Sequence, residues 1–177
     1  MSRSNKTTVA VHLESWGPGD LLLLTRLVGD PAMMEHLGGA ESPEKIVERH
    51  NRYLRLGDAG SGRMFKIVDD ATGKGAGSVG YWPRAWRGID VYETGWMVLP
   101  EFHGRGIAGA ATAQLIDIVR SVKARRYLHA FPSVDNAPSN AICRKLGFTL
   151  LEALDFEYPP GHFMRCNDWR LDLEDHE

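Results

Sequence analysis

Hydrophobic and polar positions follow two different periods along this chain, and each period predicts a kind of element. Val9, Val11 and Leu13 alternate with polar or small residues, which is typical of a half-buried strand. Comparable strand patterns occupy residues 64–68, 77–81, 90–99, 127–131, 149–157 and 164–173. Helical spacing or helix caps mark residues 20–28, 42–56, 107–122 and 136–146. This mixture, with no repeat or linker, predicts one α+β domain over residues 1–177.

The clearest helix covers residues 107–122, where apolar side chains recur at helical spacing. Those side chains are Ile107, Ala111, Leu115, Ile118, Val119 and Val122. The helix over 136–146 has its strongest signal at the end. Gly147 suits a left-handed C-cap, and Phe148 is expected to fold back onto Ile142 or Cys143.

Composition restricts the class of protein. Hydrophobic residues make up 43% of the 177, which is enough for one globular core. A net charge of −2 gives no general attraction for nucleic acid or an anionic membrane, so neither is an expected partner. Residues 1–6 precede no apolar stretch, so we expect no signal peptide. The two cysteines, Cys143 and Cys166, form no metal spacing and are interpreted as reduced thiols. We expect a cytoplasmic protein.

The most informative stretch is 92–108. It begins as a strand carrying Glu93 and ends in glycines where the long helix starts. Glycines at a helix start leave backbone N–H groups uncovered, and the helix dipole there acts like roughly half a positive charge. The N–H groups from about Gly104 to Gly109 are therefore predicted to bind an anion, with phosphate the best candidate.

Two segments match the spacing GxGxxG, and they favour different structures. The glycines at 75, 77 and 80 lead into a strand, so we interpret them as hairpin residues. Those at 104, 106 and 109 open a helix, which keeps phosphate binding in place. A dinucleotide fold is disfavoured, because residues 100–103 interrupt the strand-to-helix turn and Asp135 is the only acidic residue near the end of the next strand.

At this point the chain resembles the GNAT superfamily of acyl-coenzyme A dependent N-acyltransferases over nearly its whole length. The family's pyrophosphate signature falls on His103, Gly106 and Ala108, with His103 replacing the usual Arg or Gln. A second signature falls on Asn136, Ser139 and residues 146–148. The resemblance implies a mixed, mostly antiparallel sheet of about seven strands flanked by about four helices. It also implies acetyl-CoA as co-substrate and no metal.

The same resemblance implies a set of cofactor-binding residues. The signature positions and the strand main chain before them give Met97, Val98, Leu99, His103, Gly104, Arg105, Gly106, Ile107, Ala108, Gly109, Asn136 and Ser139. For Asn136 the alternative is a plain helix N-cap, and the two roles are compatible. For the main chain of 97–99 to meet the cofactor, the strand must separate from its neighbour after Trp96.

The N-terminal half resembles the ribosomal-protein-alanine (RimJ/RimL-like) branch of this family. The residues that carry this resemblance lie at 29–38, 65–73, 77–80 and 93–96. Members of that branch acylate protein N-termini or other amines, so an amine acceptor is implied, and a homodimer is compatible with the resemblance. The identity of the acceptor stays open.

Glu93 is the candidate general base. It matches the strand glutamate that many family members use, and a carboxylate beside an anion site is otherwise badly placed. The alternative is a carboxylate that merely pairs with a nearby Arg or Lys. Cys143 stands where the family often has a tyrosine that protonates the leaving thiolate. We interpret Cys143 as a packed residue, and the general acid is unassigned.

Candidates for acceptor recognition have strong structural alternatives. They are Met33, Met34, His36, Trp82, Trp86 and the loop 158–163. His129 is expected to be a hydrogen-bonded core histidine. The leading interpretation is an enzyme that transfers acetyl from acetyl-CoA directly to a primary amine. The alternatives are a non-catalytic acyl-CoA sensor on the same fold and, third, a dinucleotide-binding protein.

Overall fold

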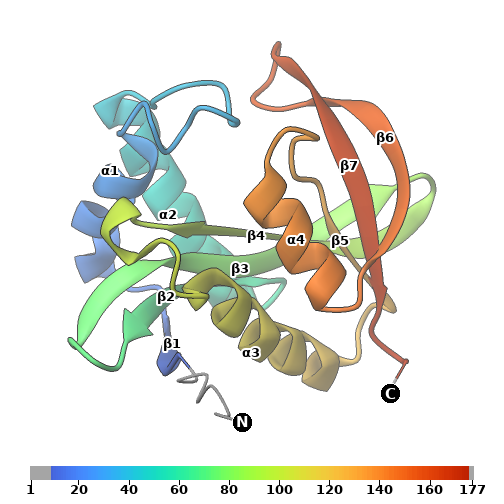
Figure 1. Cartoon of the computed structure of the whole chain (residues 1–177), viewed down its shortest axis with the longest axis horizontal. Helices are drawn as coiled ribbons and strands as arrows, with labels where there is room; N and C mark the ends of the chain where they lie inside the picture. The colour runs from blue at the N-terminus through green and yellow to red at the C-terminus, as the bar shows by residue number, and fades with distance from the viewer. Residues whose placement is uncertain (1–8, 176–177) are drawn as a thin grey trace, which may run out of the picture.

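The computed structural model describes residues 9–175, which form a seven-stranded sheet in the order β1-β2-β3-β4-β5-β7-β6 (Figure 1). The strands are β1 (Val11–Ser15), β2 (Arg63–Asp69), β3 (Lys74–Trp86), β4 (Ile89–Val98), β5 (Tyr127–Ala130), β6 (Thr149–Glu157) and β7 (Phe163–Asp172). Among the strands of the described residues, only β4 and β5 pair in parallel. The predicted α+β class, with a mixed and mostly antiparallel sheet, is confirmed. The segment 1–6, on which the signal-peptide expectation rests, lies outside the described residues.

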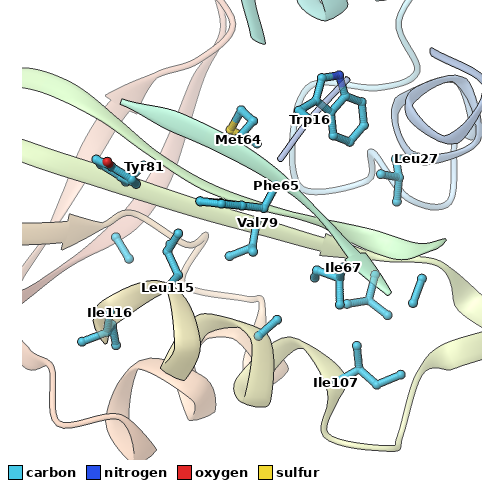
Figure 2. Close-up of a cluster of buried hydrophobic side chains, with 14 of the residues drawn as sticks. Trp16, Leu27, Met64, Phe65, Ile67, Val79, Tyr81, Ile107, Leu115 and Ile116 are labelled. Carbon is cyan, nitrogen blue, oxygen red and sulfur yellow. The ribbon is translucent and has the colours of Figure 1, made fainter. Parts of the chain in front are cut away.

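Four helices cover the two faces of this sheet. They are α1 (Leu21–Val28), α2 (Pro43–Ala59), α3 (Ile107–Val122) and α4 (Ala137–Lys145). Figure 2 shows Trp16, Leu27 and Met64 on one side of β2 and β3, and Ile67, Val79 and Leu115 on the other side. The first group packs with α1 and α2, and the second packs with α3. Within residues 9–175, no helix is long and apolar enough to cross a bilayer.

The long helix α3 follows its predicted period, with one difference at its end. Its buried residues are Ile107, Ala111, Thr112, Leu115, Ile116 and Val119. Val122, which we assigned to the apolar stripe, is 40% exposed because it is the last helical residue and lies beyond the sheet contact. The predicted end of α4 is confirmed. Gly147 has φ +85°, and the N–H of Phe148 donates to the carbonyl of Cys143 at 3.0 Å.

Strand β3 extends farther than the sequence predicted. The sequence predicted a strand over 77–81, but β3 continues to Trp86 and turns at Arg87 and Gly88, which both have positive φ, before β4 returns. Pro83 is tolerated inside this strand because β2 pairs with β3 only as far as Tyr81, so the missing N–H faces no partner strand. The extension matters because it carries Arg84 and Trp86 over the site described below.

The parallel pairing of β4 and β5 is very short. Tyr92 pairs with Leu128 and Glu93 pairs with His129, and β4 then continues to Val98 without β5 beside it. The expected separation of the two strands is therefore present, and it begins directly after Glu93.

The close contact between β3 and β4 predicts the effect of one substitution. A Cβ at Gly77 would lie 2.0 Å from the carbonyl oxygen of Met97, so Gly77→Ala must displace main chain. We expect a loss of about 1–3 kcal/mol in the free energy of unfolding, measured by urea denaturation. Gly75→Ala is the matched control, since its nearest neighbours are the flexible ends of Leu23 and Lys66 at 3.3 and 3.4 Å. Equal stability of the two variants would contradict this account.

Candidate active site

The glycine segment between β4 and α3 has the geometry of an anion site. Gly104 and Gly106 have φ of +75° and +78°, which side-chain-bearing residues rarely adopt. Gly106 is the N-cap of α3, and the first bond within the helix runs from Ala110 N to Gly106 O at 3.0 Å. The N–H groups of residues 107–109 therefore precede the helical hydrogen-bond pattern, and no described side chain caps them. They are free to bind an anion at the positive end of the helix.

Two side chains of this segment hold it in place. Arg105 donates to Asp69 Oδ1 at 3.0 Å, and Asp69 is fully buried at the end of β2. The guanidinium, followed by the Thr72 hydroxyl, lowers the pKa of Asp69. His103 Nε2 lies 2.6 Å from the carbonyl oxygen of Val98 and is the donor there, because a carbonyl only accepts. His103, which departs from the usual family residue, thus ties the glycine segment to the end of β4.

The open edge of β4 presents main chain where the pairing with β5 has ended. The N–H of Leu99 donates to Ala76 O at 2.8 Å, and the alternation of an antiparallel ladder directs Met97 the same way, toward β3. Val98 then faces the open side. Of the three residues expected to meet the cofactor through main chain, the geometry favours Val98. The N–H of Leu99 is already used by the sheet.

Helix α4 follows β5, the strand from which β4 has separated. Asn136 Oδ1 accepts from the N–H of Ser139 at 3.2 Å, so the N-cap role is present and the amide nitrogen remains for another contact. Sequence reasoning missed Asn140, which is buried. Its amide donates to the carbonyls of Ser133 and Asn136, and its Oδ1 accepts from Asn167 and Trp169. Asn140 therefore fixes α4 against β7.

Glu93 lies mostly buried at the point where β4 and β5 separate. Its Oε2 accepts from Arg84 Nη1 at 2.8 Å, which is the ion pair named above as the alternative to a base. Burial raises the pKa of Glu93, and the Arg84 charge and hydrogen bond oppose that rise. The result is a carboxylate that is more basic than usual yet kept ionisable by one guanidinium, which suits a group that accepts protons.

Arg84 was missed by the sequence reasoning, and it is held by aromatic rings. Its Cζ lies 4.7 Å from the ring centre of Phe156, 5.2 Å from Trp86 and 5.4 Å from Phe131. Its Nε is buried without a described hydrogen-bond partner. The period-two alternation of β3 puts Arg84 on the same face as Trp82 and Trp86, but its pairing with Glu93 depends on the β3–β4 register.

A second buried acid–base pair lies beside Glu93. His129 Nδ1 is 2.6 Å from Asp168 Oδ1, and Asp168 Oδ2 accepts from Trp86 Nε1 at 3.0 Å. His129 is 3% exposed and Asp168 is fully buried. The expectation of a hydrogen-bonded core histidine is confirmed, although the sequence did not reveal its partner.

The two cysteines are free and buried. Burial raises the pKa of Cys143 to about 12, and burial together with the Glu93 charge raises the pKa of Cys166 to about 11. A thiol with so high a pKa is a poor proton donor near neutral pH, which supports the interpretation of Cys143 as a packed residue under Phe148.

The loop after α1 and the β6–β7 turn approach each other on the side of the sheet away from α3 (Figure 1). A Cβ at Gly38 would lie 2.6 Å from Pro159 Cδ. Arg49 of α2 donates to Glu41 at 3.0 Å and also to the hydroxyl of Tyr158. The loop 158–163, a candidate for acceptor recognition, therefore lies beside the loop after α1. Met34 is 1% exposed and belongs to the core, so it does not face an acceptor.

Comparison with protein families assigns the fold that carries this site. The model of the acetyltransferase (GNAT) domain matches residues 11–149. The chain belongs to the GNAT acetyltransferase family. A search of curated proteins finds no significant sequence match.

Solved structures share the fold of this GNAT domain at low sequence identity. A RimL ribosomal L7/L12 alpha-N-protein acetyltransferase in complex with coenzyme A has a TM-score of 0.77 and 19% identity, covering 94% of this chain and 95% of that one. Spermidine N-acetyltransferase from Vibrio cholerae, with CoA and spermine, has a TM-score of 0.75 and 18% identity, covering 92% and 95%. Ribosomal-protein-S5-alanine acetyltransferase from Vibrio fischeri has 0.74 and 19%, covering 93% of each chain.

The Arg84–Glu93 pair predicts a measurable titration. Arg84 opposes the effect of burial, so Arg84→Met should raise the pKa of Glu93 further, as measured by NMR titration of the labelled side-chain carboxyl. Arg84→Lys keeps the positive charge and should leave the Glu93 pKa closer to that of the wild type. A fall of the Glu93 pKa in Arg84→Met would contradict the account.

Proposed function

We propose that this GNAT domain transfers the acetyl group of acetyl-CoA directly to a primary amine, with Glu93 as general base. The observation that carries the proposal is the juxtaposition of a free helix N-terminus, an unpaired strand edge and a buried carboxylate within residues 93–109. In this proposal the helix N-terminus binds the pyrophosphate, the strand edge binds the pantetheine arm, and the carboxylate accepts the proton of the amine.

The cofactor half of the proposal uses the helix N-terminus and the open edge of β4. The N–H groups from Gly104 to Gly109 bind the pyrophosphate, and Val98 pairs with the pantetheine arm as a strand would. Asn136 and Ser139, at the start of α4, flank the same arm from the other side of the opening. Two of the similar structures contain CoA, which supports this choice of co-substrate.

The chemistry requires a neutral amine. At pH 7 deprotonation costs about 1 kcal/mol for an α-amine and about 4–5 kcal/mol for a lysine amine. Glu93 accepts that proton through water, the amine nitrogen attacks the thioester carbon, and another main-chain N–H on the open edge of β4 donates to the carbonyl oxygen as charge develops. The new C–N bond replaces the C–S bond, and coenzyme A leaves as a thiolate that takes a proton from solvent.

The acceptor is a protein N-terminus or a small-molecule amine. The similar structures include a ribosomal-protein acetyltransferase and a spermidine acetyltransferase, so both classes of acceptor occur on this fold. The loop after α1 and the loop 158–163 lie where an acceptor would enter. The proposal places the enzyme in the cytoplasm, where acetyl-CoA and reduced cysteines are available, and includes a homodimer as a compatible assembly.

Removal of the proposed base should slow the reaction. In a thiol-release assay over α-amine peptides, polyamines and amino acids, Glu93→Gln should lower kcat for the best acceptor by about 10²- to 10⁴-fold. CoA affinity, measured by calorimetry, should change little because the extended strand residues 94–98 separate Glu93 from the glycine segment. Asp90→Asn, an exposed carboxylate change on the same strand, is the matched control and should keep full activity.

Two results would contradict parts of this proposal. Full activity of Glu93→Gln would remove Glu93 as base while leaving the transferase intact. CoA binding with no turnover on any amine would favour the alternative of a non-catalytic acyl-CoA sensor.

A charge placed at the helix N-terminus tests the anion site. A side chain at Gly109 would meet nothing within 4 Å, and Gly109 does not need positive φ. Gly109→Asp should therefore fold and gain about 0.3–1 kcal/mol of stability from the helix dipole, yet bind CoA at least tenfold more weakly because it repels phosphate. Gly109→Asn has the same shape without the charge and should retain most of the affinity. Equal CoA affinity of the two variants, by calorimetry, would exclude this helix end as the phosphate site.

A further inference from the structure

The last residue pair joining β4 to β5 brings two titratable side chains together. Glu93 and His129 are partners in the parallel ladder, so their side chains leave the sheet on the same face. Neighbouring strands lie about 4.7–4.9 Å apart, and the strands separate directly beyond this pair. His129 therefore lies beside the proposed base, at the mouth of the opening that would receive the thioester.

The contacts of His129 determine which of its nitrogens carries a proton. An ionised Asp168 only accepts hydrogen bonds, so Nδ1 of His129 donates to it and Nε2 of the neutral ring has a lone pair. Trp86 donates to the other oxygen of Asp168, which fixes the carboxylate. Among the described residues, Nε2 has no hydrogen-bond partner and is not one of the fully enclosed polar atoms. The ring is thus oriented with an unused acceptor nitrogen.

Packing alone does not account for this pair. Asp168 is fully buried, and in residues 9–175 its ion-pair partner is His129, with no Arg or Lys in that role. A buried carboxylate without a permanent cation is costly, whereas a cation that forms on His129 would compensate it. Asp168 is therefore placed to stabilise the imidazolium that forms when His129 accepts a proton.

We propose that the Asp168–His129 pair relays the acceptor amine's proton away from Glu93. This inference rests on the proposed function. Glu93 takes the proton from the ammonium, a water carries it to His129 Nε2, and Asp168 stabilises the imidazolium. The proton returns to solvent after coenzyme A leaves, and Glu93 is again a carboxylate.

The charged groups around His129 come from three strands. Glu93 lies on β4 and Arg84 on β3, where Arg84 pairs with Glu93. Asp168, Arg170 and Cys166 lie on β7. Arg170 is the ladder partner of His129, but its Cζ stacks 4.6 Å from the ring centre of Tyr127. The nearest fixed countercharge of the ring is therefore the Asp168 carboxylate, which favours the relay.

The test compares pH profiles of His129→Gln with those of the wild type, using the best amine from the panel. A neutral His129 is needed to accept a proton, so the wild-type kcat should fall in a step on the acidic side of the pH profile. In His129→Gln we expect kcat to be reduced at least tenfold, that step in the profile to be lost, and the KM for acetyl-CoA to stay unchanged. His50→Gln is the matched control, since His50 is also buried and hydrogen-bonded, but to Trp16.

The outcomes separate this inference from the proposed function. A wild type that acetylates no amine overturns the proposed function and the relay with it. An active wild type with an unchanged profile in His129→Gln overturns the relay alone. NMR of the wild-type imidazole provides a measurement that does not depend on the folding of a variant. A neutral His129 protonated on Nδ1 is expected, and protonation on Nε2 instead would overturn the relay.

Discussion

The separation of β4 from β5 is the constraint on which the candidate site depends. Two residue pairs hold the strands together, and β4 then continues alone to Val98. Unpaired main chain inside a protein is costly unless something else pairs with it. A sheet that opens in this way, between two helix N-termini, provides a place for an extended ligand with an anionic end. The pantetheine and pyrophosphate of coenzyme A have that shape and charge.

Several charged or titratable side chains lie close together at the closed end of this opening, although the region is buried. Glu93, Arg84, Asp168 and His129 lie within neighbouring strands, and aromatic rings surround Arg84. The low dielectric of such a region strengthens each pairing and makes each unpaired charge costly. Proton transfers between these groups are therefore coupled, and a change at Arg84 or Asp168 should alter the pKa of Glu93.

Much of the fold could be predicted from the chain. Helical periodicity located α3, and Gly147 located the end of α4. The prediction that the strand ends before Pro83 was wrong, because proline is normally excluded from a central strand. Pro83 is acceptable in β3 because β2 pairs with β3 only as far as Tyr81. The error concerns the residue at which β2 stops pairing with β3, which the local sequence does not show.

By itself, the sequence was enough to predict the candidate anion site and the candidate carboxylate, because glycines at a helix start and a glutamate on the preceding strand are local features. Only the tertiary structure decided what surrounds Glu93. Arg84 reaches it through the β3–β4 register, and His129 through the short parallel pairing with β5. Asp168 arrives from β7, thirty-nine residues beyond His129. Such contacts follow from strand order and register, which hydrophobic periodicity does not encode.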